Sequence, residues 1–190
     1  MKYLIIYAHP NPKSFNHAVK ERVEALLKKE KKEFSVRDLY VIKWNPVLGG
    51  ADFEAFKNGK GSADVAKEQQ YVKESDVLIF IHPIWWFGMP AVLKGYIDRV
   101  FSYGFAYTAG PEGIKGLLSN KKVVIINTTG GTEDTYIKSG FKDAVIKVFK
   151  NGTYEFCGMK LILHKFFFAV PSITDEARKK MLDEIDKMEF

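Results

Sequence analysis

Residues 82–90, HPIWWFGMP, follow the apolar run VLIFI and place three large aromatic rings where a strand should end. Turns normally hold small polar residues, so Trp85, Trp86 and Phe87 need an explanation. Rings exposed at the mouth of a pocket can pack against a flat, apolar ligand, while backbone amides of the turn bond to its edge. The same rings could instead fill a subunit interface or an ordinary core. The stretch thus indicates a ligand-binding turn, with packing as the alternative.

The segment AHPNPKSFN, residues 8–16, carries polar side chains where a strand gives way to a helix. His9, Ser14 and Asn16 would lie at the helix N-terminus, where free amides and the helix dipole favour an anion. The segment lacks the GxGxxG fingerprint, so it does not support a nicotinamide-binding Rossmann site. The alternative to an anion site is that Ser14 simply caps the helix and His9 is solvated.

A third turn, NTTGGTEDTY at residues 127–136, combines hydroxyls, two glycines and a tyrosine. Thr128 and Thr129 end a strand, and Gly130 with Gly131 lets the backbone approach a ligand closely. Tyr136 follows in the next helix. A plain strand-to-helix connection would use similar residues, so this turn alone leaves both interpretations open.

The strands and helices that must position these turns alternate along the chain, because each apolar run is followed by a segment with helical periodicity. We expect strands at 2–8, 34–40, 77–81, 121–129 and 160–170, and helices at 14–32, 62–76, 90–103, 134–149 and 174–188. This alternation predicts an α/β fold: one domain, 1–190, with a five-stranded parallel sheet and helices on both faces. Such sheets bind ligands outside the carboxyl ends of their strands, where the three turns would meet.

Composition excludes several classes of protein. The net charge is +6, but lysines alternate with glutamates as on a solvated helix face, and only four arginines are present, so we expect no nucleic-acid partner. No apolar run reaches the ~20 residues that span a bilayer, so we expect no membrane insertion and a cytoplasmic location. Cys157 is the single cysteine, which gives no thiol cluster, and we expect no metal site.

Four strings occur in order across nearly the whole chain: AHPNPKSFN, PIWWFGMPAVLKGYIDRVF, GFAYT, and TTGG followed by Tyr136. In this combination the chain resembles the flavodoxin-like NAD(P)H:quinone oxidoreductases of the DT-diaphorase type. The resemblance implies a flavodoxin-like fold with strand order 2-1-3-4-5 and a flavin lying across the three turns. The flavin phosphate region would be held by His9, Ser14, Phe15 and Asn16. The isoalloxazine ring would be lined by Pro83, Ile84, Trp85, Trp86 and Phe87, and bordered on its other side by Thr128, Thr129, Gly130, Gly131 and Tyr136.

The resemblance also implies catalytic residues. Tyr136 would stabilise the negative charge that develops on the reduced ring. Lys142 stands where the family has a histidine; a lysine supplies a fixed positive charge but shuttles protons at neutral pH only if desolvation lowers its pKa. Tyr107, in GFAYT, matches a tyrosine that reaches into the partner subunit's active site. The family's second tyrosine is Ala109 here, which implies a wider or less polar substrate pocket.

Two further matches bear on the cofactor. Gln69 and Arg178 match a glutamine and an arginine by which FAD-binding members of the family hold the dinucleotide. The resemblance therefore favours FAD, with FMN as the alternative.

The resemblance implies a flavin-dependent enzyme that oxidises NAD(P)H and reduces quinones by two-electron, ping-pong hydride transfer, as a homodimer with shared sites. One alternative is a regulatory subunit of a potassium-efflux transporter. Another is an electron-transfer flavodoxin, which the basic charge balance disfavours because flavodoxins present acidic faces to their partners.

Overall fold

The computed structural model describes residues 1–59 and 61–190. Five parallel strands form one sheet, and the apolar strand before the aromatic turn lies at its centre. In spatial order the strands are β2 (Glu33–Asp38), β1 (Lys2–Tyr7), β3 (Val77–Pro83), β6 (Lys122–Thr128) and β7 (Lys160–Phe167). Counting these five strands alone, the order is the predicted 2-1-3-4-5. The predicted fold class is confirmed.

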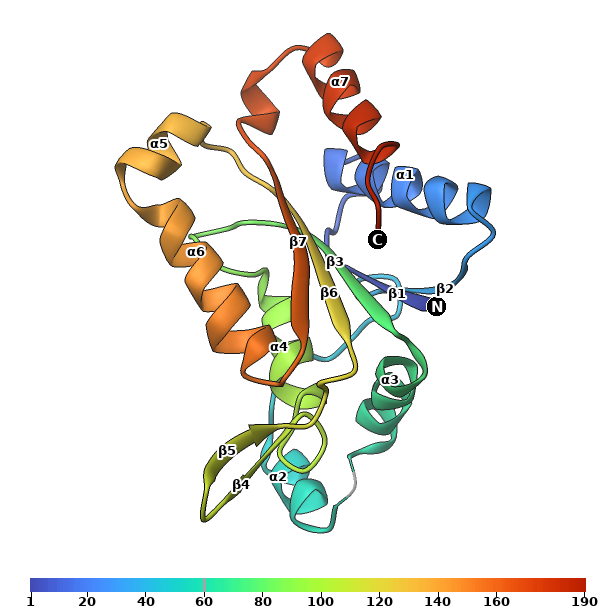
Figure 1. Cartoon of the computed structure of the whole chain (residues 1–190), viewed down its shortest axis with the longest axis vertical. Coiled ribbons are helices and arrows are strands. Elements are labelled where there is room, and N and C mark those ends of the chain that lie inside the picture. Colours follow the sequence, from blue (N-terminus) through green and yellow to red (C-terminus); the bar gives the residue numbers. More distant parts are fainter. Residues whose placement is uncertain (60) are drawn as a thin grey trace.

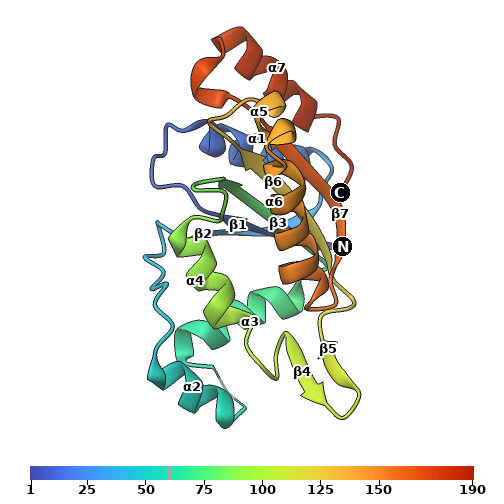
Figure 2. The same ribbon diagram turned by 90° about the vertical axis from the view of Figure 1, so that its left-hand side faces the viewer.

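Helices cover both faces of the sheet (Figures 1 and 2). One face carries α1 (Phe15–Lys29) and α7 (Asp175–Ile185), whose apolar residues share a core with the sheet. The other face carries α3 (Ala63–Glu74), α4 (Ala91–Val100) and α6 (Phe141–Phe149). None of the helices within the described residues is long and apolar enough to cross a membrane.

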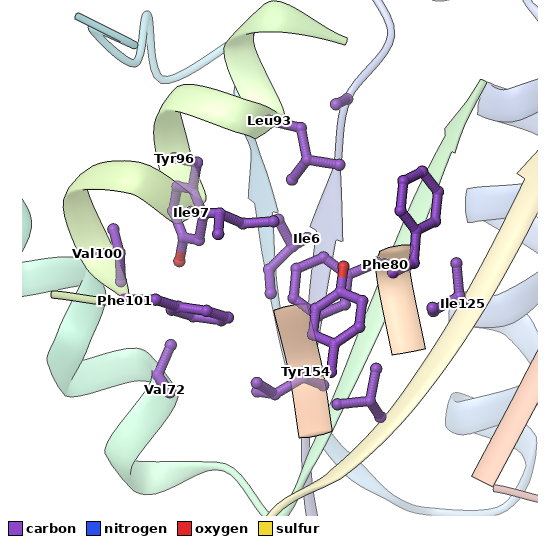
Figure 3. Close-up of a cluster of buried hydrophobic side chains, with 14 of the residues drawn as sticks. Ile6, Val72, Phe80, Leu93, Tyr96, Ile97, Val100, Phe101, Ile125 and Tyr154 are labelled. Carbon is purple, nitrogen blue, oxygen red and sulfur yellow. The ribbon is translucent and has the colours of Figure 1, made fainter. Parts of the chain in front are cut away.

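The core explains the unbroken apolar run at 77–81. Every residue of β3 is buried, because neighbouring strands flank it and helices cover it on both sides. Phe80 packs against the Tyr154 ring with centroids 4.7 Å apart, and α4 directs Leu93 and Tyr96 toward the same cluster (Figure 3).

Three local features differ from the predicted pattern of strands and helices. Residues between the predicted helix at 90–103 and the next strand form an antiparallel hairpin of β4 (Tyr107–Gly110) and β5 (Gly113–Gly116). The stretch after β2, for which no helix was predicted, contains α2 (Gly50–Lys57). The predicted helix at 134–149 is divided into α5 (Glu133–Lys138) and α6, because Gly140 takes a left-handed conformation with φ of 74°.

Two short helices complete the chain. A π-helix, η1 (Lys150–Glu155), continues from α6 and leads toward β7. A single 3-10 turn, η2 (Val170–Ser172), follows β7 and leads to α7.

Arg99 of α4 clamps the segment between β2 and α3. Its guanidinium donates to both carboxylate oxygens of Asp52 at 3.0 Å each, and to Asp64 at 2.7 Å. It also donates to the Asn45 carbonyl at 2.9 Å and lies 4.8 Å from the Trp44 ring. Hydrogen bonds from Arg99 hold the pKa of the buried Asp52 carboxyl below its usual value. Because a lost partner would leave a buried charge unpaired, this network ties α2 firmly to α4.

Gly95 permits the same segment to cross α4 at close range. A Cβ atom at this position would lie 2.1 Å from the Pro46 carbonyl oxygen. We expect Gly95→Ala to lower the free energy of unfolding by about 1–3 kcal/mol, because the backbone must shift to relieve the overlap. Urea unfolding measures this loss.

Gly152→Ala is the matched control, since a Cβ atom built there has no neighbour within 4 Å. It should leave stability unchanged or slightly increased, because alanine favours helix over glycine. Equal unfolding midpoints for the two variants would contradict the close crossing.

Candidate functional site

A cavity of about 550 Å³ lies at the carboxyl ends of the strands. The turns after β1, β3 and β6 all contribute to it, as expected for a parallel sheet at a switch point in strand order. The sequence-predicted residues that line it are His9, Ser14, Phe15, Asn16, Pro83, Ile84, Trp85, Trp86, Thr128, Thr129 and Gly130.

The N-terminus of α1 forms one wall. Ser14 caps the helix as predicted, its hydroxyl accepting from the His17 amide at 3.1 Å. Asn16 is buried, and its amide nitrogen donates to the Thr128 hydroxyl at 2.7 Å, which joins the helix to the end of β6. The other amide atom of Asn16, Oδ1, is buried without a hydrogen-bond partner. An unsatisfied polar atom beside free helix amides is typical of a site that completes its hydrogen bonds with a ligand.

The aromatic turn forms the opposite wall as a tight two-residue loop. Trp85 and Gly88 exchange two backbone hydrogen bonds of 3.1 and 3.0 Å. Between them, Trp86 and Phe87 have φ of 51° and 57°, left-handed values that are uncommon for large side chains. Trp86 is 98% exposed, so packing within the chain does not explain its position. Strained residues that retain exposed rings point to a functional role.

A second layer of aromatic residues supports this turn. The Phe87 ring stacks on Phe141 of α6 with centroids 3.7 Å apart and lies 5.6 Å from the ring of Tyr136. Gly131 leaves room for that tyrosine, since a Cβ atom there would be 3.1 Å from its ring. Burial raises the pKa of Tyr136, so its hydroxyl stays protonated and can donate. Phe87, Gly131 and Tyr136 therefore border the cavity wall rather than line the cavity itself.

Sequence reasoning missed three lining residues, Asn11, Val170 and Pro171. Asn11 donates its backbone amide to Nδ1 of His9 at 3.1 Å, which fixes the imidazole 5.7 Å from the Trp85 ring. Val170 and Pro171 follow β7, whose carboxyl end lies at the same edge as the other three. Applying the carboxyl-edge rule to the last strand as well would have found them.

Arg178 lies beside this cavity in an adjoining groove of about 490 Å³. The groove shares Ser14, Phe15, Val170 and Pro171 with the cavity and runs between α1 and α7. Arg178 donates to the Val170 carbonyl at 2.8 Å and to Asp175 at 2.7 Å. The predicted arginine is therefore next to the site.

The structure does not bring the other three predicted residues to the cavity. Gln69 donates to the Val100 carbonyl at 3.0 Å and to the Ser102 hydroxyl at 3.1 Å, so its side chain joins α3 to the end of α4. Its predicted role in holding the dinucleotide stays a prediction, since in this chain the amide makes these two bonds away from the cavity lining. Tyr107 lies with the β4–β5 hairpin at the opposite end of the sheet (Figure 1).

Lys142 is also turned away from the cavity. Its ammonium group bonds to Glu133 at 2.6 Å and lies 5.6 Å from the Phe168 ring. The predicted positive charge is thus paired with a carboxylate outside the cavity lining.

A buried polar network lies behind the end of β3. His82 and Asn127 are fully buried and paired in register across β3 and β6, and Asn127 also bonds to His164 of β7. Burial lowers the pKa of His82 to about 4. Burial and the neighbouring His82 lower the pKa of His164 to about 3. Both imidazoles are therefore neutral at pH 7.

The residues present fit a flavin. The free amides at the start of α1 suit a phosphate, and the exposed Trp86 ring suits a flat heteroaromatic face. The Thr129 hydroxyl donates to the Gly131 carbonyl at 2.7 Å, and this bond holds the turn after β6 in shape.

Comparisons with known proteins agree with this architecture. A family model described as a flavodoxin-like fold matches residues 1–188. Over 184 residues the chain is 35% identical to an uncharacterized NAD(P)H oxidoreductase of Haemophilus influenzae, covering 96% of this chain and 91% of the relative. It is also 35% identical over 199 residues to NAD(P)H dehydrogenase (quinone) 1 of Cavia porcellus, covering 94% and 72%.

A solved structure gives the same result. The NAD(P)H:quinone oxidoreductase from Methanothermobacter marburgensis superposes with a TM-score of 0.89 at 28% identity, covering 98% of this chain and 96% of that one. The parallel sheet with a cavity at its carboxyl edge defines a flavodoxin-like protein. The chain belongs to the flavodoxin-like family that the model describes, and its resemblance to NAD(P)H:quinone oxidoreductases is confirmed.

The buried histidines make stability depend on pH in a defined direction. In the unfolded chain both would titrate near pH 6.5, well above their values in the folded protein. The contribution of the two neutral histidines to the free energy of unfolding is complete above about pH 6.5. It is lost as pH falls toward 4, because the unfolded state binds protons more readily than the folded state. The loss is on the order of 1.4 kcal/mol per pH unit for each imidazole.

Urea unfolding at pH 7 and pH 5 measures this loss. A double variant, His82→Gln with His164→Gln, should show a much smaller difference between the two pH values. An equal pH dependence in both proteins would place its origin in other groups.

Proposed function

We propose that this chain is a flavin-dependent NAD(P)H:quinone oxidoreductase. The observation that carries the proposal is the shared cavity, in which an anion-binding helix N-terminus faces an exposed aromatic turn. The named activities of the relatives supply the substrate classes, a reduced nicotinamide and a quinone. A bound flavin supplies two-electron chemistry, taking a hydride from the nicotinamide and giving it to the quinone.

The protein's own residues bind and orient. The first amides of α1 would hold the phosphate, and the turn at 83–88 would hold the ring system through backbone amides and aromatic contact. Tyr136 holds a proton on its hydroxyl next to the turn and would donate to negative charge that develops during reduction. The nicotinamide and the quinone would bind one after the other at the same open side of the cavity, which favours ping-pong kinetics.

FAD is the proposed form of the cofactor. The cavity and the groove between α1 and α7 share four lining residues, so a dinucleotide could extend from one into the other. Lys13, Arg178 and Lys179 line that groove and give it a basic character suited to a diphosphate. FMN would leave this groove empty.

The absorbance spectrum and an anaerobic titration test the function as a whole. The purified protein should be yellow or become yellow with FAD, and NADPH should bleach that colour until a quinone restores it. A protein that quenches neither FAD nor FMN fluorescence would refute the proposal.

Trp86→Ala tests the role of the aromatic turn. Because Trp86 is 98% exposed, its loss should change the stability of the apoprotein by less than about 0.5 kcal/mol. Flavin affinity should fall about tenfold, since ring contacts of this kind contribute roughly 0.5–1.5 kcal/mol. Fluorescence quenching and thermal unfolding measure the two effects.

Val41→Ala provides the control, because Val41 is also largely exposed but lies outside the cavity. It should change neither quantity. If Trp86→Ala greatly lowers the stability of the apoprotein and leaves flavin affinity unchanged, the ring stabilises the fold and does not bind the ligand.

A homodimer is the proposed assembly. Tyr107 cannot reach the cavity of its own chain, which lies at the other end of the sheet (Figure 1). It lines a groove of about 390 Å³ with exposed apolar side chains that include Phe53 and Tyr103. A two-fold dimer would cover this surface and bring Tyr107 to the partner's site.

Sedimentation at micromolar concentration tests the dimer, and subunit mixing tests the shared site. When subunits that carry an inactivating change in the turn at 83–88 are mixed with an equal amount of Tyr107→Ala subunits, about half the dimers are mixed, and each of these has one intact site. One quarter of all sites are then intact, so activity should recover to about one quarter of the wild-type activity. If mixed dimers form and recover no activity, Tyr107 does not serve the partner's site.

A further inference from the structure

The hydrogen bonds among His82, Asn127 and His164, behind the aromatic turn, determine which ring nitrogens carry protons. The Pro83 carbonyl can only accept, so Nδ1 of His82, 2.9 Å away, must carry the proton. In the neutral imidazole Nε2 is then an acceptor, and it is the nearer ring nitrogen to the Asn127 amide nitrogen, at 3.1 Å against 3.4 Å for Nδ1. That nitrogen also donates to the His82 carbonyl at 3.0 Å.

The third member fixes the direction of the chain of bonds. Asn127 turns its oxygen toward Nε2 of His164, which donates at 2.8 Å. Because this bond commits the oxygen, the nitrogen must face His82, and the amide cannot rotate without losing both partners. Nδ1 of His164 is left buried without a partner, so the chain of bonds ends there.

These bonds connect the end of β3 to the side chains behind it. Pro83 has no amide hydrogen, so the end of β3 lacks one donor at the point where the chain enters the turn. The side chains of His82 and Asn127 donate to the two successive carbonyls at this point, those of residues 83 and 82. The next backbone bond, from the Ile84 amide to the Thr128 carbonyl at 2.8 Å, already belongs to the cavity wall.

Side-chain alternation places the network directly behind the site. Pro83 and Thr128 line the cavity, whereas His82 and Asn127, one residue earlier on the same strands, point to the opposite face. There the His82 ring lies 5.7 Å from Phe149 of α6. The network therefore contacts the turn through its backbone and has no access to a ligand.

We propose that His82 and Asn127, oriented by His164, are positioning residues that hold the turn at 83–88 in its ligand-binding conformation. The turn needs such support because Trp86 and Phe87 are left-handed and Trp86 has no packing of its own. The part that concerns flavin rests on the proposed function. The part that concerns the turn applies to the apoprotein.

Hydrogen exchange of the apoprotein tests the inference without any ligand. His82→Leu and Asn127→Leu should each speed exchange at the amides of Ile84, Trp85 and Gly88 about tenfold, as expected when one buried hydrogen bond is lost. Exchange in β1 and β2 should be unchanged. His82→Asn keeps an amide donor close to the position of Nδ1 and should exchange within about threefold of wild type.

Which of the two His82 variants exchanges faster at the turn distinguishes a positioning role from a packing role. In an apolar environment packing alone predicts that leucine is tolerated at least as well as asparagine. Leucine variants that exchange like wild type at the turn, or loosening that spreads evenly over the sheet, would overturn the inference.

Two further measurements complete the design. Flavin dissociation constants should rise about tenfold for His82→Leu and little for His82→Asn; if wild type binds no flavin, the proposed function fails while the exchange experiment still decides the inference. Should the leucine variants not fold, nitrogen NMR of wild type decides: a proton on Nδ1 of His82 and on Nε2 of His164 supports the network, and the opposite tautomer at His82 refutes it.

Discussion

The passage of the chain out of β3 is the constraint on which the site depends. A fully buried strand ends in Pro83, which has no amide hydrogen, and then turns back through two left-handed aromatic residues. Neither feature is favourable by itself. The side chains of His82 and Asn127 donate to the carbonyls of residues 83 and 82, and the stacked Phe141 ring holds the Phe87 side of the turn. Strain at this turn is tolerated because its surroundings are rigid.

The cavity is formed by elements that are distant in sequence and joined by few direct bonds. The bond between Asn16 and Thr128 links the first helix to the fourth sheet strand across more than half the chain. It uses one side of the Asn16 amide and leaves the other unsatisfied. The same residue thus joins two walls of the cavity and keeps a buried amide oxygen without a partner.

The two ends of the sheet have different roles. The carboxyl end carries the cavity, whereas the amino end carries α2 and the β4–β5 hairpin with its exposed aromatic side chains (Figure 1). Arg99 ties the α2 segment to α4 through two carboxylates, and Gly95 permits the close crossing. A surface held this rigidly within one chain is suited to recognition by a second copy, because little conformational freedom is lost on binding.

The sequence by itself determined the parallel sheet, because apolar strands alternate with amphipathic helices, and the resemblance to a known family supplied the strand order. It also indicated most residues of the cavity, since parallel strands bring their carboxyl ends to one edge. Only the tertiary structure decided the rest. Gln69 is committed to the end of α4 and Lys142 to Glu133, while the turn after β7 joins the cavity. The role of His82 became visible only when Asn127 and His164 were seen beside it, because strand register, and not spacing along the chain, brings these three side chains together.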